Sequence, residues 1–413
     1  MESALPTQAV RQGGFFGAAK PFAVSFVEQM MMGGASILAL IFCVSISAFR
    51  FNMLDDVRAF LQFCAESTVV FATIFSYPHF MWSYRFAYGQ GHQFIAKHWW
   101  ELIVFPLGIV ALCAFSAVTW KTPVNQVPFL LSLESLVAPS GIMLGLSEYK
   151  SLGNLTFASL FLAQFIMSGY HYGMQAFGAS MHFAEKRGFC FSKDQRAALK
   201  YYLYALWAMN LFSGYTFLSI INGRYFGIHP VRFPEWIQVS SWVFYLVALL
   251  FLSRRVLAPM LKEHGKLPPV IVCMPILAVT VWLQPFFQPY GFQLWIVPLA
   301  HGLQYLYFSL VAESGGFDPH LDKINRTAYL KTVLYVCFFA FMCLAGYAAF
   351  RGLPLFLDNS HALTTVSPNF FFVAAYMFLS VHHYVIDGVA WRPDSRAKQV
   401  ICRSAREERC QPL

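Results

Sequence analysis

Apolar runs long enough to cross a membrane recur along the whole chain and are separated by short polar loops. An α-helix rises 1.5 Å per residue, so about 20 apolar residues cover the ~30 Å hydrocarbon layer of a bilayer. Ten runs meet this requirement, the shortest only just: 33–50, 60–84, 99–119, 153–184, 200–221, 236–253, 268–288, 291–312, 327–350 and 366–390. The pattern predicts an all-α fold, a polytopic integral membrane helix bundle of about ten transmembrane helices.

A further run, 127–147, is harder to assign. It is apolar, but Glu134 and the helix-breaking Pro139 lie near its middle. A carboxylate and an interrupted helix favour a re-entrant or surface segment over a full span. An eleven-span bundle therefore remains an alternative.

Lysine and arginine counts predict the orientation of the bundle. From residue 153 onward, the loops on one side of the membrane carry 18 of these residues and the loops on the other side carry three. Because basic loops stay in the cytoplasm, we expect residues 1–32 to be a cytoplasmic N-terminal segment, 33–390 a single transmembrane domain and 391–413 a cytoplasmic tail. Before residue 153 the counts do not distinguish ten spans from eleven. We expect a multi-pass protein of the plasma (inner) membrane.

The composition agrees with a membrane protein and argues against a nucleic-acid partner. Hydrophobic residues make up 58% of the chain and charged residues 12%, against about 25% charged residues in soluble proteins. The net charge of +9 comes from basic residues in short loops between apolar runs, as the positive-inside rule requires. Membrane lipids are the expected partners, and nucleic acid is not.

Polar residues inside a membrane are costly, so they are the first candidates for function. Of the twelve histidines, six fall within predicted spans: His79, His171, His182, His301, His382 and His383. In the ten-span arrangement all six lie on helices that run from outside to inside and at similar depths. Four different helices then offer imidazoles to one zone of the bundle, whereas eleven spans would leave three.

Helical phase sharpens this prediction. At 100° per residue, His171 and Gln175 share one face of their helix with His182. On the last span His383 and Asp387 are four residues apart and share a face, so they can bind one metal together. His382 points about 100° away from His383, and the pair can reach one centre only by flanking it.

Several imidazoles and one carboxylate in an apolar bundle suit iron, copper or zinc, and do not suit magnesium or calcium. Gln175 and Gln304 are expected to position ligands or an oxygen-derived species, and Tyr376 to relay protons. These three are the predicted catalytic residues. The predicted metal ligands are His79, His171, His301, His382, His383 and Asp387.

The histidines do not reproduce the HxxxH and HxxHH boxes of integral membrane di-iron desaturases. Only the His382–His383 pair is present, and the position three residues before His382 is Leu379. The comparison with such enzymes therefore concerns chemistry alone.

The leading hypothesis is a membrane-embedded oxidoreductase with a histidine-ligated metal centre, non-haem iron, that acts on a hydrophobic small molecule, a lipid or isoprenoid. A separate electron-donor protein is expected at the cytoplasmic face. The alternatives are a haem-binding membrane protein and a proton-coupled transporter that uses the His/Asp cluster as a protonation relay. A structural interpretation of the same histidines is a polar network that packs the helices together without a metal.

Overall fold

The computed structural model describes residues 26–41, 70–214, 231–264, 269–284, 292–317, 328–360 and 366–409. Parts of the predicted spans 33–50, 60–84, 200–221 and 268–288, and most of the predicted segment 1–32, lie outside these residues. The helices within them are α4 (Tyr77–Tyr88), α5 (His92–Lys97), α6 (Phe105–Val118), α7 (Pro128–Val137), α8 (Leu152–Lys186), α9 (Lys193–Met209), α11 (Glu235–Leu252), α12 (Ala258–His264), α13 (Val270–Trp282), α14 (Phe292–Ser314), α16 (Ala328–Tyr347), α17 (Leu353–Asn359), α18 (Phe370–Ala390) and α19 (Arg396–Arg409).

The all-α prediction is confirmed for the described residues. Their single β-type contact is an isolated bridge between Met143 and Arg232. Several helices begin or continue through π-helical turns, for example Ala72–Ser76 directly before α4 and Ala348–Gly352 between α16 and α17. Such turns widen the helix locally and are frequent near functional sites.

Five of the described helices are long and apolar enough to cross a membrane, which suggests a multi-pass membrane protein. They are Trp100–Val118, Leu152–Lys186, Glu235–Lys262, Thr332–Asn359 and Phe370–Ala390. Two shorter apolar helices, Phe26–Ile41 and Val270–Trp282, accompany them. The other predicted spans are shorter, more polar, or extend beyond the described residues.

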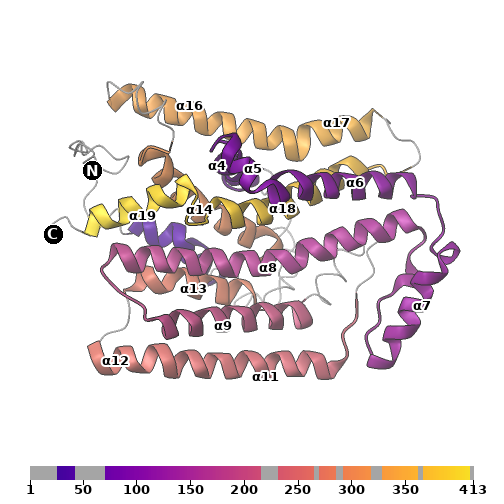
Figure 1. Cartoon of the computed structure of the whole chain (residues 1–413), viewed down its shortest axis with the longest axis horizontal. Coiled ribbons are helices and arrows are strands. Elements are labelled where there is room, and N and C mark those ends of the chain that lie inside the picture. The colour runs from indigo at the N-terminus through magenta and orange to yellow at the C-terminus, as the bar shows by residue number, and fades with distance from the viewer. Residues whose placement is uncertain are drawn as a thin grey trace, which may run out of the picture.

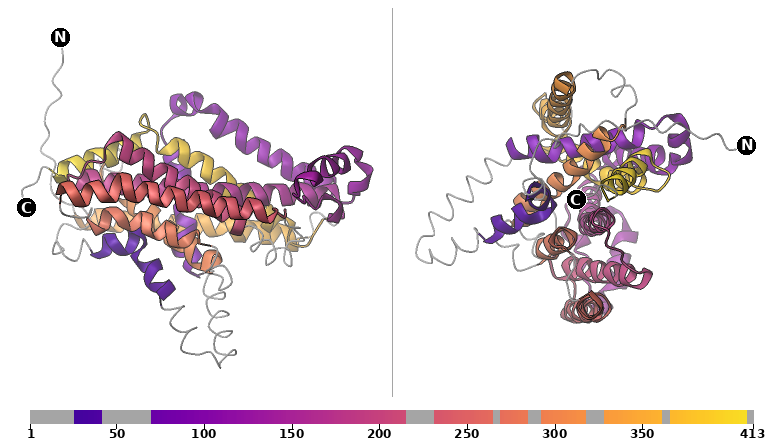
Figure 2. Two further views of the ribbon diagram at one scale, coloured as in Figure 1. Left: turned by 90° about the horizontal axis from the view of Figure 1, so that it is seen from below. Right: turned by 90° about the vertical axis from the view of Figure 1, so that its left-hand side faces the viewer.

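Helix α8 runs along the long axis of the molecule, and other helices pack around it (Figure 1). Helices α9 and α11 lie on one side, and α16 and α17 on the opposite side (Figure 1). The end-on view in Figure 2 shows α18 and α14 between these two edges. The interior of the bundle therefore lies where α4, α8, α14 and α18 meet.

Local sequence explains how two of these helices begin. Ser151 caps α8 by accepting a hydrogen bond from the Asn154 amide at 3.2 Å. The carboxylate of Asp358 accepts from the amides of Phe371 and Phe372, both at 2.9 Å, in the first turn of α18. A carboxylate there satisfies free amides and complements the helix dipole.

Residues 127–147 form the ten-residue helix α7 and short 3₁₀ turns, with no helix long enough to cross a membrane. They lie at the opposite end of the molecule from α19 (Figure 1). Helix α19, within the predicted tail 391–413, packs back on α8 and α14. Its buried residues Ala397, Ile401 and Ala405 form the contact face.

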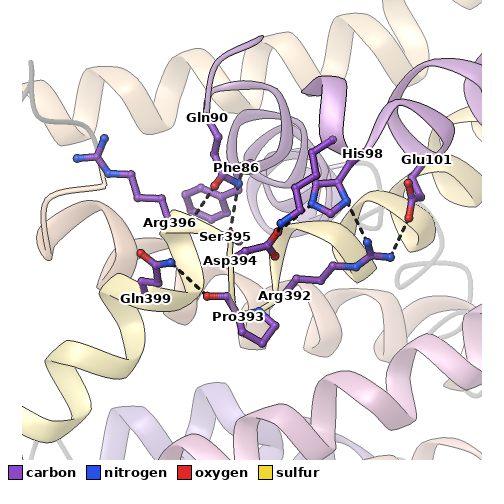
Figure 3. Close-up of polar contacts among 11 residues, drawn as sticks. Phe86, Gln90, His98, Glu101, Arg392, Pro393, Asp394, Ser395, Arg396 and Gln399 are labelled. Atoms are coloured by element: carbon purple, nitrogen blue, oxygen red, sulfur yellow. Dashed lines mark hydrogen bonds and ion pairs between the residues drawn. The ribbon is translucent and has the colours of Figure 1, made fainter. Parts of the chain in front are cut away.

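A polar network holds the connection between α18 and α19 against the segment 90–101 (Figure 3). The Lys97 ammonium lies 2.6 Å from the Asp394 carboxylate, and His98 Nε2 lies 3.2 Å from the same oxygen. Arg392 contacts His98 Nδ1 at 2.9 Å and Glu101 at 2.8 Å. We call these five residues the α18–α19 clamp, because they fix where α19 starts.

Candidate metal centre

Four histidines and one aspartate from four helices meet inside the bundle. His79 lies on α4, His171 on α8 and His301 on α14, whereas His383 and Asp387 lie one turn apart on α18. No more than 7% of any of these residues is exposed. We refer to the five residues as the histidine cluster.

A glycine lets α14 approach the start of α4 closely. A Cβ added at Gly302 would collide with the Phe75 carbonyl and would lie 3.2 Å from Nδ1 of His79. Only glycine therefore allows the backbone beside His301 to come this near to His79. The two imidazole rings end with their centroids 5.0 Å apart.

The cluster contains two overlapping sets of three ligands. One set is His79, His301 and His383, and the other is His171, His383 and Asp387; within each set, one ligand atom per residue lies within 4.8 Å of the others. Nε2 of His171 and of His383 lie 3.6 and 3.7 Å from Oδ2 of Asp387. Nε2 of His171 and of His301 are 3.1 Å apart. Ligand atoms bound to one ion at ~2.1 Å are at most ~4.2 Å apart, so these three distances fit a shared ion.

Six buried polar atoms of the cluster have no hydrogen-bond partner among the described residues. They are Nδ1 and Nε2 of His79, the same two atoms of His383, Nδ1 of His301 and Oδ2 of Asp387. Each buried polar group left without a hydrogen bond costs about 1–3 kcal/mol. A cation is the partner that imidazole nitrogens and a carboxylate oxygen can share, so these buried His₃ and His₂Asp groups can hold a metal ion.

The donor set restricts which ion fits. Imidazole nitrogens with one carboxylate suit iron, copper or zinc, whereas calcium and magnesium prefer oxygen ligands throughout. The identity of the ion is not fixed by these ligands alone, because all three transition metals accept them.

Aromatic side chains surround the cluster and one of them orients its carboxylate. The Tyr305 hydroxyl donates to Oδ1 of Asp387 at 3.0 Å, leaving Oδ2 directed toward the histidines. The rings of Tyr384 and Tyr172 lie 4.8 Å from His171 and 4.6 Å from His301. None of these three tyrosines is among the predicted site residues. Their helical phase, four residues after His301 for Tyr305, was the available signal.

His382 lies outside the cluster, although it was predicted as a ligand. Its Nδ1 lies 3.0 Å from the Tyr84 hydroxyl and its Nε2 lies 3.4 Å from the Tyr88 hydroxyl. Both ring nitrogens therefore have partners on α4. The next residue, His383, points about 100° away from His382 around the helix axis and faces the cluster.

The predicted catalytic residues surround the cluster at different distances. Gln175 donates from Nε2 to the His301 carbonyl at 3.3 Å and to Oε1 of Gln304 at 3.2 Å. Gln304 in turn donates to the Met32 carbonyl at 2.8 Å, so the pair joins α8, α14 and the segment 26–41. Tyr376 is 39% exposed and packs on Phe350, with ring centroids 6.2 Å apart. It lies two turns before His383 on α18, about 10 Å along the helix axis.

A cavity of about 230 Å³ begins beside the cluster and extends between α8, α14, α18 and α19. His171 and Asp387 line one end of it. His182, Lys398 and Ile401 line the other end, where α19 covers the bundle. The candidate ligands His171 and Asp387 are thus next to a partly open cavity large enough for a small molecule.

Comparisons with protein-family models, with curated proteins and with solved structures find no match to this chain.

Proposed function

We propose that the chain is a membrane-embedded oxidoreductase whose histidine cluster binds non-haem iron and whose substrate is a hydrophobic molecule of the lipid or isoprenoid class. The observation that carries the proposal is the set of six buried ligand atoms on α4, α14 and α18 that have no hydrogen-bond partner among the described residues. Structural packing histidines normally find hydrogen-bond partners, as His382 does.

The ligand types favour iron among the transition metals. His171, His383 and Asp387 form a two-histidine, one-carboxylate set, the type found in non-haem iron(II) oxygenases. Structural zinc sites are more often built with cysteine, and no cysteine belongs to either group of candidate ligands.

In this proposal the protein residues bind, orient and enclose the metal. The four histidines hold the ion, and Tyr305 fixes the Asp387 carboxylate by donating to its second oxygen. The surrounding aromatic rings exclude water, and the cavity beside His171 admits the substrate. When bound, iron supplies one-electron and oxygen chemistry. A separate donor protein would supply electrons, docking on the basic end of the bundle.

A haem is less compatible with this geometry than a single ion. Ring centroids of the four histidines are 4.8 to 6.1 Å apart in the pairs His171–His301, His79–His383, His79–His301, His171–His383 and His301–His383. Imidazoles packed against one another leave no flat slot for a macrocycle between two axial ligands.

The test is to purify the protein in detergent without chelators and to measure its metal content together with its visible spectrum. We expect about one iron per chain and no Soret band. A Soret band would establish the haem alternative instead. A protein that binds no iron even after anaerobic loading would contradict the proposal and favour a protonation relay through His301, His171 and Asp387.

A further inference from the structure

The cavity beside the cluster is widened by two glycines. Gly178 on α8 and Gly388 on α18 both line it, and a Cβ added at either position would meet no atom within 4 Å. Other glycines on the same helices are needed for close packing, since a Cβ at Gly169 would lie 2.8 Å from the Trp207 ring. The space beside Gly178 and Gly388 is therefore not used for helix contact.

The two ends of the cavity differ in chemistry. At the inner end are the metal-ligating candidates His171 and Asp387. At the outer end is Lys398, half-buried, with no hydrogen bond or ion pair in the described part of the chain. Both Lys398 and Lys186 act electrostatically on His182. Lys186 is paired with Glu28 at 2.6 Å, so Lys398 supplies the uncompensated positive charge at this end among the described residues.

The walls between these ends are mainly apolar. Met174, Ala179, Phe308 and Ile401 contribute to them. His171 and His182 are eleven residues apart on α8, which corresponds to about 16 Å of helical rise. The cavity volume of about 230 Å³ is below the ~300–1,000 Å³ of pockets that hold drug-sized ligands. This volume, if spread over the about 16 Å between the two ends, fits one slender alkyl chain and not a two-chain lipid.

We infer that the cavity binds a single-chain amphiphile with a carboxylate head, with the head beside Lys398 and the chain directed toward His171 and Asp387. This inference names the substrate class of the proposed function and rests on it for the chemistry at the inner end. An unpaired ammonium is a natural partner for a carboxylate, because charge-assisted hydrogen bonds are about twice as strong as neutral ones.

The experiment uses the full chain in phosphatidylcholine nanodiscs, stripped of metal with a chelator so that binding is measured independently of iron. The probe is a saturated C12 fatty acid with a terminal diazirine, and the labelled peptides are mapped by mass spectrometry. We expect labelling of α8 and α18 near Met174 and Tyr384. The matching C12 alcohol should label at least about tenfold less, the change expected for one lost charge-assisted hydrogen bond.

Three variants test where the alkyl chain of the probe lies. Gly178→Leu and Gly388→Leu should fill the cavity and abolish labelling. Gly108→Leu is the matched control, because Gly108 is exposed on α6, outside the cavity, and an added Cβ there also meets nothing. Gly178→Ala should lower labelling partially, which keeps the test valid if the leucine variants fail to fold.

Lys398→Gln tests the position of the head. It should reduce labelling by the fatty acid about tenfold and leave labelling by the alcohol unchanged. Labelling that is insensitive to Gly178→Leu would overturn the inference, as would stronger labelling by a C12 phosphate diazirine probe than by the carboxylate. If the fatty acid labels the cavity but the purified protein binds no iron in the separate metal analysis, only the oxidoreductase proposal is overturned. If the protein binds iron but the cavity is not labelled, only this inference is overturned.

Discussion

The histidine cluster and the α18–α19 clamp are both built around histidines, yet their polar atoms are satisfied in opposite ways. In the clamp, His98 lies between Arg392 and Asp394, and Lys97 and Glu101 complete the network (Figure 3). In the cluster, six nitrogen and oxygen atoms have no hydrogen-bond partner among the described residues. The polar atoms of the clamp satisfy one another, whereas those of the cluster leave ligand atoms that a metal ion could bind.

The same contrast separates two neighbours on α18. His382 contacts two tyrosine hydroxyls, and His383 contacts three other imidazoles and one carboxylate. Both residues are at most 1% exposed. Burial alone thus does not identify a metal ligand. On α18 the two histidines differ instead in their hydrogen-bond partners, which His382 has and His383 lacks among the described residues.

The largest effect is expected from removing the ligand common to both sets. His383→Ala should weaken iron binding by more than about 100-fold, because changing a residue that only orients a ligand already costs 10–100-fold. His382→Ala is the matched control and should retain the metal. The measurement is iron content by mass spectrometry after dialysis against a weak chelator. Equal loss in both variants would mean that the two neighbours do not differ in role.

A smaller effect is expected from the tyrosine that orients the carboxylate. Tyr305→Phe removes the donor to Oδ1 of Asp387 and should weaken iron binding by about 10–100-fold. Tyr307→Phe is the control, since the Tyr307 hydroxyl donates to Glu28 at 3.0 Å and not to the cluster. Titration of iron into the metal-free protein measures both. An unchanged affinity in Tyr305→Phe would show that Asp387 needs no orientation.

The sequence predicted the inward faces of single helices but not how those faces meet. Helical phase placed His383 and Asp387 together, and depth placed them level with His79, His171 and His301. The structure brings these five residues together. Phase could not tell whether His382 or His383 would face the other histidines, because it fixes angles within a helix and not the direction of its neighbour.

How neighbouring helices approach one another could not be predicted from the sequence, because it depends on contacts between distant residues. The approach of α14 to α4 depends on Gly302, and the partners of His382 lie almost 300 residues earlier in the chain. Hydropathy is also an incomplete guide to which helices belong to the bundle. Helix α14 carries the buried polar residues His301, Gln304 and Glu313, which lower its hydropathy although it contributes to the interior of the bundle.

Bound iron should change the relative stability of the wild type and a variant of the histidine cluster. In the metal-free protein, His79→Leu removes two unpartnered buried nitrogens, which cost about 1–3 kcal/mol each. We expect its apparent melting temperature to equal or exceed that of the wild type by about 1–4 °C. With iron at 100 times its Kd, the wild type should gain about 2.7 kcal/mol and the variant less, so the difference in melting temperature should narrow or reverse.

The control for this reversal comes from the clamp. His98→Leu removes an imidazole whose two nitrogens both have partners. It should lower the melting temperature with or without iron, because partners of a removed group lose their hydrogen bonds. Destabilisation of the metal-free protein by His79→Leu would mean that the cluster is satisfied without a metal.

The smallest effect is expected in the clamp itself. The hydrogen bond from Lys97 lowers the pKa of Asp394 to about 2, from about 3.9 in an unfolded chain. A depressed carboxyl pKa stabilises the folded state above about pH 4, and this contribution is lost as the pH falls through about 2. Hydrogen exchange of α19, corrected for the intrinsic rate, should therefore stay constant from pH 5 to pH 4.

Asp394→Asn removes this charge at every pH. It should accelerate exchange in α19 by no more than about fivefold, because exposed ion pairs contribute little. Iron content should not change, since Asp394 lies outside both ligand sets. Glu407→Gln is the control on the same helix, because its exposed pair with Arg403, at 4.0 Å, is separate from the clamp. Iron loss in Asp394→Asn would contradict the comparison, because it would make the clamp and the histidine cluster one cooperative unit.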